Sequence, residues 1–186
     1  MTTSFLLLLV FIAVLLAWAV ALFNRLVRLR NQVRTAWADI DVQLTRRHDL
    51  VPSLVAAVKG YAGHESNVLE TATALRAQAA TLKAPAQLGG VETALGQALD
   101  RVVALQEAYP DLKANQNFSQ LQHDLVDVEE QLQYARRFYN GAVRDYNDAV
   151  QRVPDMFVAR GCGFHGAEFF QANDAQREAV KVELSR

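Results

Sequence analysis

The sequence has little cysteine, no excess of charge of one sign and no glycine-rich phosphate loop. Its single cysteine, Cys162, excludes an intrachain disulfide and a metal site built on paired cysteines. The net charge of −1 provides no basic field for nucleic acid, and no stretch interleaves basic and aromatic residues. These absences argue against a disulfide scaffold and a nucleic-acid-binding protein.

Metal ligands are not spaced for a shared site. Di-iron helical bundles use Glu-x-x-His pairs, but the residues three before His64 and His123 are Tyr61 and Gln120. His64 is followed directly by Glu65, and adjacent side chains on a helix point about 100° apart. We therefore predict no metal and no other cofactor.

Nucleophilic catalysis is also poorly supported. Cys162 lies between two glycines and has His165 three residues further on. A catalytic pair must meet in space with an orienting third group, which proximity in sequence does not provide. We interpret Cys162 as a thiol in a turn and predict no catalytic residues and no small-molecule substrate.

The chain does have a long apolar run near its N-terminus. Residues 5–23 read FLLLLVFIAVLLAWAVALF, nineteen positions without a charge. A helix of that length covers about 28 Å, close to the roughly 30 Å hydrocarbon core of a bilayer. We predict a membrane anchor over residues 1–24. Four basic residues follow before any acidic one: Arg25, Arg28, Arg30 and Arg34.

Two features favour a retained anchor over a cleaved signal peptide. Residues 1–4 contain no lysine or arginine, and the apolar run exceeds the usual length of a signal-peptide core. The basic residues all follow the span, so the positive-inside rule predicts a single-pass protein of the inner membrane with its large domain in the cytoplasm. A periplasmic domain is the alternative. We expect the four arginines to lie at the membrane interface.

Beyond the anchor, the apolar residues recur at steps of three and four, as in amphipathic helices. We expect one unbroken helix to continue from the span to Val51. Pro52 then either kinks this helix or lies in the first turn of a new one. The pattern resumes and continues to about Leu82, weakened locally by Gly60 and Gly63.

Two further helices are predicted from the same pattern. Pro85 and the Gly89-Gly90 pair indicate a loop, and a helix follows from Val91 and ends by residues 109–111. Another begins near Phe118 or Ser119, runs to about Val150 and is stopped by Pro154. Residues 154–170 read as a turn or short helix. No segment alternates with period two, so the predicted fold is an all-α antiparallel bundle of about four long helices.

Aromatic residues recur along the last long helix. We expect all four to pack in the core, because large aromatic side chains dominate burial in narrow bundles. The asparagines that follow two of these tyrosines, at positions 140 and 147, are expected to form hydrogen bonds across helices. The four aromatic residues are Tyr134, Phe138, Tyr139 and Tyr146.

A charged stretch near the Pro52 junction is the candidate interaction surface. It is either a solvated face that adds little stability or a docking face for another protein. Its residues are Asp39, Asp41, Arg46, Arg47, His48 and Asp49.

Three long strings now resemble one family. They are NRLVRLRNQVRTAWADIDVQLTRRHDLVPSLVAAVKGYAGHE over residues 24–65, YPDLKANQNFSQLQHDL over 109–125, and YARRFYNGAVRDYNDAVQRVPDMFVARGCGF over 134–164. Together they closely resemble the LemA family of bacterial membrane proteins. The resemblance implies one N-terminal span and a bundle of long helices, here over residues 25–174. The polar composition of residues 175–186 predicts a C-terminal tail. It implies no accepted catalytic residues.

The leading functional hypothesis is a non-enzymatic helical scaffold anchored in the bacterial cytoplasmic membrane. Its expected partners are the lipid bilayer, other membrane proteins or further copies of itself. One alternative is a homo-oligomer that shapes membranes. Another is a metal-dependent membrane-bound enzyme or regulator that uses His48, His64 and Glu65.

Overall fold

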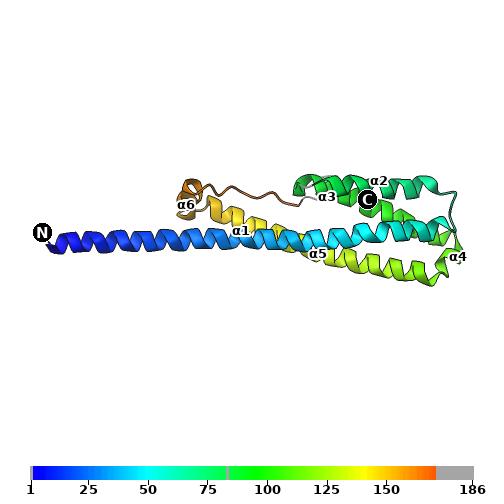
Figure 1. Cartoon of the computed structure of the whole chain (residues 1–186), viewed down its shortest axis with the longest axis horizontal. Helices are drawn as coiled ribbons and strands as arrows, with labels where there is room; N and C mark the ends of the chain where they lie inside the picture. Colours follow the sequence, from blue (N-terminus) through cyan, green and yellow to red (C-terminus); the bar gives the residue numbers. More distant parts are fainter. Residues whose placement is uncertain (1, 83, 171–186) are drawn as a thin grey trace, which may run out of the picture. The chain divides into compact units, whose positions relative to one another are not determined.

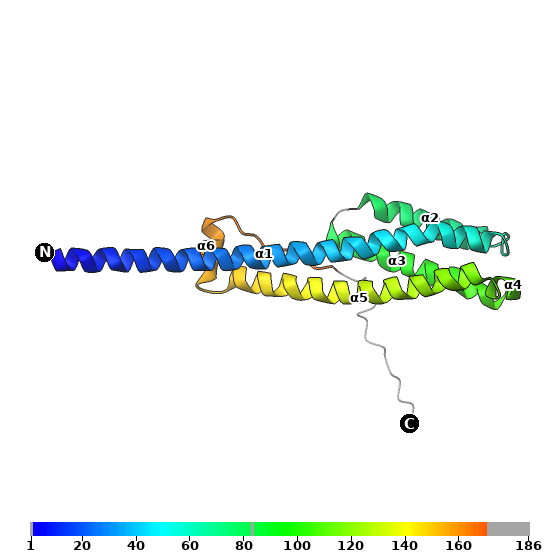
Figure 2. The same cartoon turned by 60° about the horizontal axis from the view of Figure 1, so that its bottom comes forward.

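In the computed structural model of the chain, residues 2–82 and 84–170 are described (Figures 1 and 2). They form six α-helices and one 3-10 helix and contain no strand, which confirms the all-α prediction. The predicted tail over residues 175–186 lies outside this part of the chain. The elements are α1 (Thr2–Lys59), α2 (Ser66–Thr81), α3 (Pro85–Ala104), η1 (Leu105–Glu107), α4 (Pro110–Lys113), α5 (Gln116–Gln151) and α6 (Asp155–Gly161).

The chain divides into two compact units, and the two longest helices contribute to both. Within the described residues, unit 1 comprises residues 2–40 and 135–168, and unit 2 comprises residues 41–82, 84–134 and 169–170. The predicted bundle domain, residues 25–174, therefore draws on both units.

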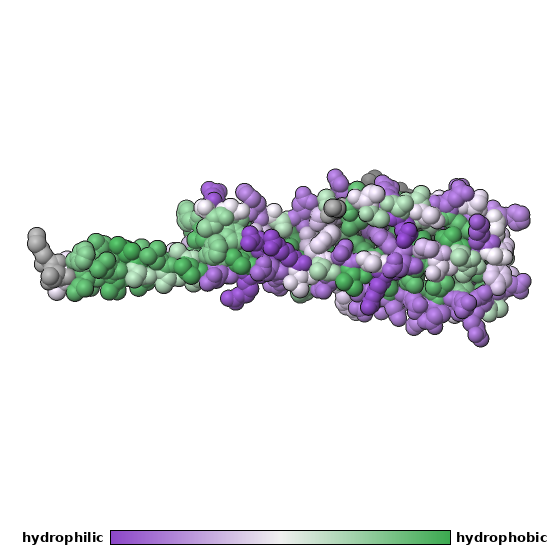
Figure 3. Space-filling model, in the orientation of Figure 1, coloured by the Kyte–Doolittle hydropathy of each residue, from purple (hydrophilic) through white to green (hydrophobic). Residues whose placement is uncertain are grey.

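Unit 1 begins with the apolar run of α1. Among the described residues, α1 is the only helix that is long and apolar enough to cross a membrane. No residue in its most apolar stretch is buried. Except for Leu22, which is partly exposed, the large side chains of the run are 39–71% exposed. They form the continuous hydrophobic surface at the N-terminal end of α1 in Figure 3.

The rest of unit 1 pairs the following part of α1 with the C-terminal part of α5. Trp37 of α1 packs against Tyr139 of α5, with ring centroids 5.3 Å apart. Tyr139 and Tyr146 are buried, as predicted, because a seven-residue interval places both on one helix face. The prediction is wrong for Tyr134 and Phe138, which are exposed, since they lie on a different face of α5.

Unit 2 is an antiparallel arrangement of four helical segments. Residues 41–59 of α1, then α2, α3 and the first part of α5 run in alternating directions (Figures 1 and 2). Their apolar stripes converge on one hydrophobic core. The fully buried core residues of this unit include Val51, Leu54, Val58, Leu95, Leu99, Val102, Leu112 and Phe118.

Pro52 does not end α1, which continues through it to Lys59. A proline inside a helix costs about 3 kcal/mol, because a backbone hydrogen bond is lost and the ring crowds the preceding turn. Pro52 itself is exposed, whereas Val51 and Leu54 on either side are 1% exposed. Burial of these neighbours in the core of unit 2 offsets the local cost.

The first real break comes at Gly60, which corrects the expected continuation to Leu82. α1 ends at Lys59 and α2 begins at Ser66. The amides of Tyr61 and Ala62 both donate to the carbonyl of Val58, at 3.0 and 2.8 Å, and so close the end of the helix. Glycines at positions 60 and 63 lower helix propensity enough for the chain to turn back here.

The expected loop at Pro85 and Gly89-Gly90 is also corrected. Pro85 is the first residue of α3, the position where proline is favoured because its missing N–H has no helical partner. Gly89 and Gly90 lie inside the helix. α5 begins two residues before the expected start, and the Asn115 side chain accepts a hydrogen bond from the Phe118 amide at 3.1 Å, as an N-cap does.

Candidate functional site

In unit 1, α6 is held against α1 at the end of the apolar run. Arg25 donates to Asp155, the first residue of α6, at 2.6 Å. Phe23 packs edge-on against Phe164, with ring centroids 5.6 Å apart, and the Arg30 guanidinium lies 4.9 Å from the centre of the same ring. We refer to these five residues as the α6 clasp.

The segment after α6 is fixed along α5. The Asn147 side chain forms two hydrogen bonds with the backbone of Ala167, donating to its carbonyl at 3.0 Å and accepting from its amide at 2.8 Å. A Cβ on Gly166 would lie 3.2 Å from the Asn147 carbonyl oxygen, so glycine permits this close approach. Asn147 therefore binds an extended segment rather than a second helix.

Two buried tyrosines line the same face of α5. The Tyr139 hydroxyl donates to the carbonyl of Glu168 at 2.8 Å. Burial raises the pKa of Tyr139, and the negative charge of Glu168 raises it further. Burial also raises the pKa of Tyr146, an effect that the positive charges of Arg30 and Arg34 partly oppose. Both hydroxyls are thus held in their neutral form.

The four arginines that follow the apolar run have different environments. Arg25 and Arg30 belong to the α6 clasp, whereas Arg28 and Arg34 are exposed. The sequence indicated a shared interfacial role but not the partner of Arg25. Asp155 is 1% exposed and was not singled out, because nothing local distinguishes an aspartate at a helix start from a solvated cap.

Unit 2 contains a buried ion cluster, formed by Arg47, His48, Glu92 and Glu129. Arg47 is 2% exposed and Glu92 is fully buried. One Arg47 amino group lies 3.1 Å from a Glu92 carboxylate oxygen and also donates to the Glu92 carbonyl at 3.1 Å. The other lies 2.9 Å from Glu129 of α5, and His48 Nε2 lies 2.6 Å from the second Glu92 oxygen.

The surrounding helices are shaped to hold this cluster. A Cβ on Gly96, one turn after Glu92, would lie only 2.7 Å from an Arg47 amino group. Arg76 of α2 donates to the carbonyl of His48 at 2.7 Å. The cluster thus connects all four helical segments of unit 2. Removal of one partner from a buried ion pair strongly destabilises a fold, because the remaining charge stays buried without its partner.

Four of the six residues of the predicted interaction surface are exposed to solvent. Asp39 in unit 1 is exposed, as are Asp41, Arg46 and Asp49 in unit 2. Arg47 departs from the prediction, because its side chain is buried in the ion cluster.

His48 is also turned inward, with its side chain 15% exposed. Glu92 was missed altogether. A signal existed, since Glu92 occurs at the helical spacing of Leu88, Leu95 and Leu99 and therefore lies on the inward face of α3. A lone acid on an apolar stripe indicates a buried partner.

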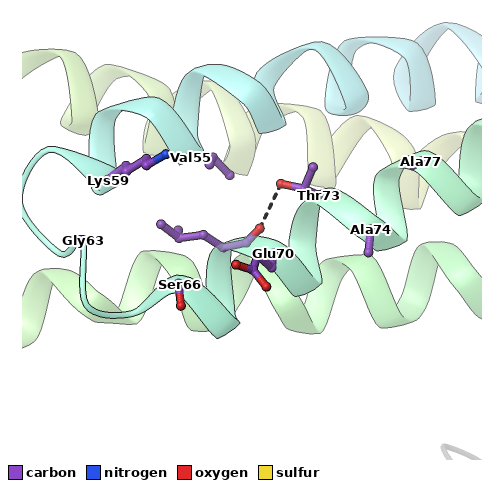
Figure 4. Close-up of a pocket in the computed structure, with 9 residues that line it drawn as sticks. Val55, Lys59, Gly63, Ser66, Glu70, Thr73, Ala74 and Ala77 are labelled. Carbon is purple, nitrogen blue, oxygen red and sulfur yellow. Dashed lines mark hydrogen bonds between the residues drawn. The ribbon is translucent and has the colours of Figure 1, made fainter.

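Unit 2 also contains an open groove of about 440 Å³ between the end of α1 and α2 (Figure 4). Its lining is mostly small or apolar. Its charged residues are Lys59 and Glu70. The Thr73 hydroxyl donates a hydrogen bond to the Leu69 carbonyl at 2.9 Å. With no histidine or cysteine in the lining, the groove offers no paired nucleophile and base.

Within residues 2–82 and 84–170, no three histidine, cysteine, aspartate or glutamate side chains are arranged to hold a metal ion. His64 is exposed in the turn between α1 and α2, whereas His48 contacts Glu92 in the buried cluster. The two histidines of the metal-dependent alternative therefore have separate environments.

Comparison with known proteins decides the family. A sequence model described as the LemA family matches residues 36–184. The chain belongs to the LemA family. This confirms the resemblance that was inferred from the three long strings.

Several curated proteins are similar to this chain in sequence. Protein LemA of Metamycoplasma hominis is 24% identical over 161 residues, which cover 84% of this chain and 72% of that protein. Magnetosome protein MamQ 2 of Paramagnetospirillum magneticum is 31% identical over 86 residues, or 46% of this chain. That match spans about a third (32%) of the magnetosome protein.

A related MamQ from Magnetospirillum gryphiswaldense is 29% identical over the same length. Neither the family description nor these names describes an enzyme. The family and the apolar N-terminal helix together indicate a membrane-associated protein.

Proposed function

We propose that this protein is a helical scaffold anchored in the bacterial cytoplasmic membrane, where it presents surfaces to partner membrane proteins or to further copies of itself. The observation that carries the proposal is the exposed apolar run of α1. Residues 5–23 are free of charge, and α1 continues from them through the rest of its part of unit 1 and into unit 2.

A bilayer is the environment that suits this run. Soluble monomers rarely expose a contiguous apolar surface of more than a few hundred Å². The run has the length of a bilayer core, about 28 Å, and its backbone groups are satisfied inside one helix, as a membrane requires. Its side chains face outward all round, which lipid accepts and water does not.

The helix rise assigns depths to the four arginines. Relative to Phe23, Arg25 lies about 3 Å further along α1, within a headgroup layer of roughly 5–7 Å, and Arg28 lies about 7.5 Å along, at the outer edge of that layer. Arg30 and Arg34 lie about 10 and 16 Å along, beyond most of that layer. Arg28 is exposed and therefore suited to bind lipid phosphates, whereas Arg30 supports the protein itself.

The positive-inside rule favours a cytoplasmic location for unit 2 and for the part of unit 1 that follows the span. Cys162 gives a direct test, because it is the only cysteine and is exposed. In intact cells we expect a membrane-impermeant maleimide to leave Cys162 unlabelled until the membrane is opened. Labelling of intact cells would instead place the domain in the periplasm.

The scaffold surface comprises the exposed charged residues of the predicted stretch. In unit 2 these are Asp41, Arg46 and Asp49, and all three side chains are free of the buried ion cluster. Charged residues on the rim of an interface set specificity and association rate more than affinity, which suits a surface that recruits partners.

A photo-crosslinking amino acid at each of positions 41, 46 and 49 tests this surface in living cells. Gln78 of α2, also exposed in unit 2, is the matched control position. We expect discrete crosslinked products from the three charged positions and none from position 78. A chain that stays in the membrane but gives no crosslinked product from any of the three positions would contradict the scaffold function.

A second candidate function is membrane shaping by a homo-oligomer, and the similarity to magnetosome proteins named MamQ motivates it. If the crosslinked partner is the chain itself, electron microscopy of liposomes that carry the full-length protein distinguishes two cases. Regular assemblies would support membrane shaping by homo-oligomers, and isolated dimers would support a simple scaffold.

A further inference from the structure

An exposed apolar patch covers the turn into α6 in unit 1. Val153 and Phe157 are 61% and 65% exposed, and Pro154, Met156 and Val158 are partly exposed beside them. We call these five residues the α6 patch. In Figure 3, hydrophobic surface extends over the region of α6, next to the apolar surface of α1.

The α6 clasp fixes the level of this patch along α1. Asp155 is bound to Arg25, two residues after the apolar run ends, and Phe164 packs on Phe23, its last residue. Arg25 lies about 3 Å beyond Phe23 along the helix axis. If residues 5–23 fill the hydrocarbon core, α6 therefore lies in the headgroup layer.

The chemistry of the patch suits that layer. Apolar and aromatic side chains flanked by cations are typical of segments that lie in the membrane interface. Two exposed arginines, Arg152 and Arg160, flank the patch on either side in sequence. The carboxylate of Asp155 is buried and paired with Arg25, so it does not repel lipid phosphates.

We propose that the α6 patch is a second membrane contact, in which Val153 and Phe157 enter the boundary between headgroups and acyl chains. The occupant is the lipid surface rather than another copy of the chain, because the patch is continuous with the exposed span and held at its end. This inference rests on the proposed membrane anchor. In this arrangement α6 lies in the membrane interface and stabilises α1 at the point where α1 leaves the bilayer.

Single-cysteine variants of the full chain, made in a Cys162→Ser background, test the contact. Phe157→Cys reports the patch. Phe138→Cys is the matched control, because Phe138 is also an exposed phenylalanine of unit 1. Its neighbour Tyr139 packs on Trp37, about 21 Å beyond Phe23 along α1. Val14→Cys, in the middle of the apolar run, reports the anchor itself.

Each variant is labelled with an environment-sensitive fluorophore and reconstituted in vesicles of phosphatidylethanolamine and phosphatidylglycerol. Lipids that carry a nitroxide on the headgroup or in mid-chain then act as quenchers. We expect the probe at 157 to lose most of its emission to headgroup nitroxide, the probe at 14 to be quenched from mid-chain, and the probe at 138 to keep its emission.

Failure of this inference can be distinguished from failure of the anchor. Quenching at 14 together with equal emission at 157 and 138 would overturn the α6 contact alone. Self-quenching at 157 that rises with the protein-to-lipid ratio, without quenching by labelled lipid, would show that a second copy covers the patch and would also overturn it. No quenching at 14 would overturn the anchor.

Discussion

The two compact units bury charge in different ways. In unit 2, Arg47 and Glu92 are both sealed from solvent and bind each other, with His48 and Glu129 completing the cluster. In unit 1, Asp155 is buried but its partner Arg25 keeps 49% of its side chain exposed.

This difference separates two uses of an ion pair. A sealed pair tolerates no loss of a partner, because the remaining charge has no access to water. A half-open pair, in which the anion is buried and the cation is partly exposed, holds a segment in place while the cation still contacts solvent or lipid headgroups. In unit 2 the charged groups join the helices through buried contacts, whereas in unit 1 the pair holds α6 at the end of the apolar run.

The largest effect is expected from breaking the sealed pair. Glu92→Ala leaves Arg47 buried with too few partners, and we expect a loss of about 3–5 kcal/mol in the free energy of unfolding. Denaturant titration followed by circular dichroism measures this loss. Arg46→Ala, which removes an exposed neighbouring arginine, is the control and should change stability by less than about 0.5 kcal/mol. Equal losses in the two variants would contradict the assigned roles.

The half-open pair should be weaker. Asp155→Ala removes a hydrogen bond to a charged group, worth about 1.5–3 kcal/mol, but leaves Arg25 free to meet water. We expect α6 to detach from α1 while unit 2 stays folded. Hydrogen exchange should show faster exchange of the α6 amides and unchanged exchange in α2 and α3. Loss of protection in both units would contradict the division into separate units.

Glycine substitutions in α3 sharpen the description of the ion cluster. A Cβ at Gly90 meets nothing within 4 Å, so Gly90→Ala should raise stability by up to about 1 kcal/mol through helix propensity. Gly96→Ala instead crowds the Arg47 guanidinium, and overpacking of this kind costs about 1–3 kcal/mol. Thermal unfolding of the two variants tests the difference. A gain at Gly96 equal to that at Gly90 would mean that Arg47 moves aside freely.

Alkaline pH should weaken unit 1 through its two buried tyrosines. Both have a pKa raised above the ordinary value of 10.0, so the unfolded chain releases these protons first. The stability that the two neutral tyrosines contribute is fully present below pH 10. It is lost as the pH rises through their pKa values in the folded protein. Trp37 emission, followed in a Trp18→Phe background, reports this unfolding. The double variant Tyr139→Phe/Tyr146→Phe should show a shallower loss, and an unchanged slope would contradict burial as the cause.

Much of the fold was predictable because helical spacing, apolar length and proline position act locally. The end of α5 near Val150 followed from the apolar periodicity and from Pro154. The same reasoning placed all four aromatic residues of α5 in the core, which is right for Tyr139 and Tyr146 and wrong for Tyr134 and Phe138. Local rules failed where tertiary packing overrides them. Pro52 remains within α1 because the residues around it are buried, and Gly89-Gly90 lies inside α3 because Pro85 already begins that helix.

The candidate sites were predicted less well, for a physical reason. The pairs Arg25–Asp155 and Arg47–Glu92 join residues 130 and 45 positions apart, and sequence spacing cannot reveal such partners. The sequence pattern assigned Arg47 to a charged surface because its neighbours Arg46 and Asp49 belong to one. Only the position of Glu92 on an apolar stripe gave a local sign of the buried cluster.

The most direct test of the membrane anchor is the fate of the intact chain in bacterial membranes. A small epitope placed before residue 2 and another after residue 186 follow both ends of the expressed protein through a wash at high pH that strips peripheral proteins. We predict that both epitopes remain together in the membrane pellet, and that deletion of residues 5–23 releases the chain. A chain that has lost the first epitope and appears in the soluble fraction would contradict the anchor and the scaffold function built on it.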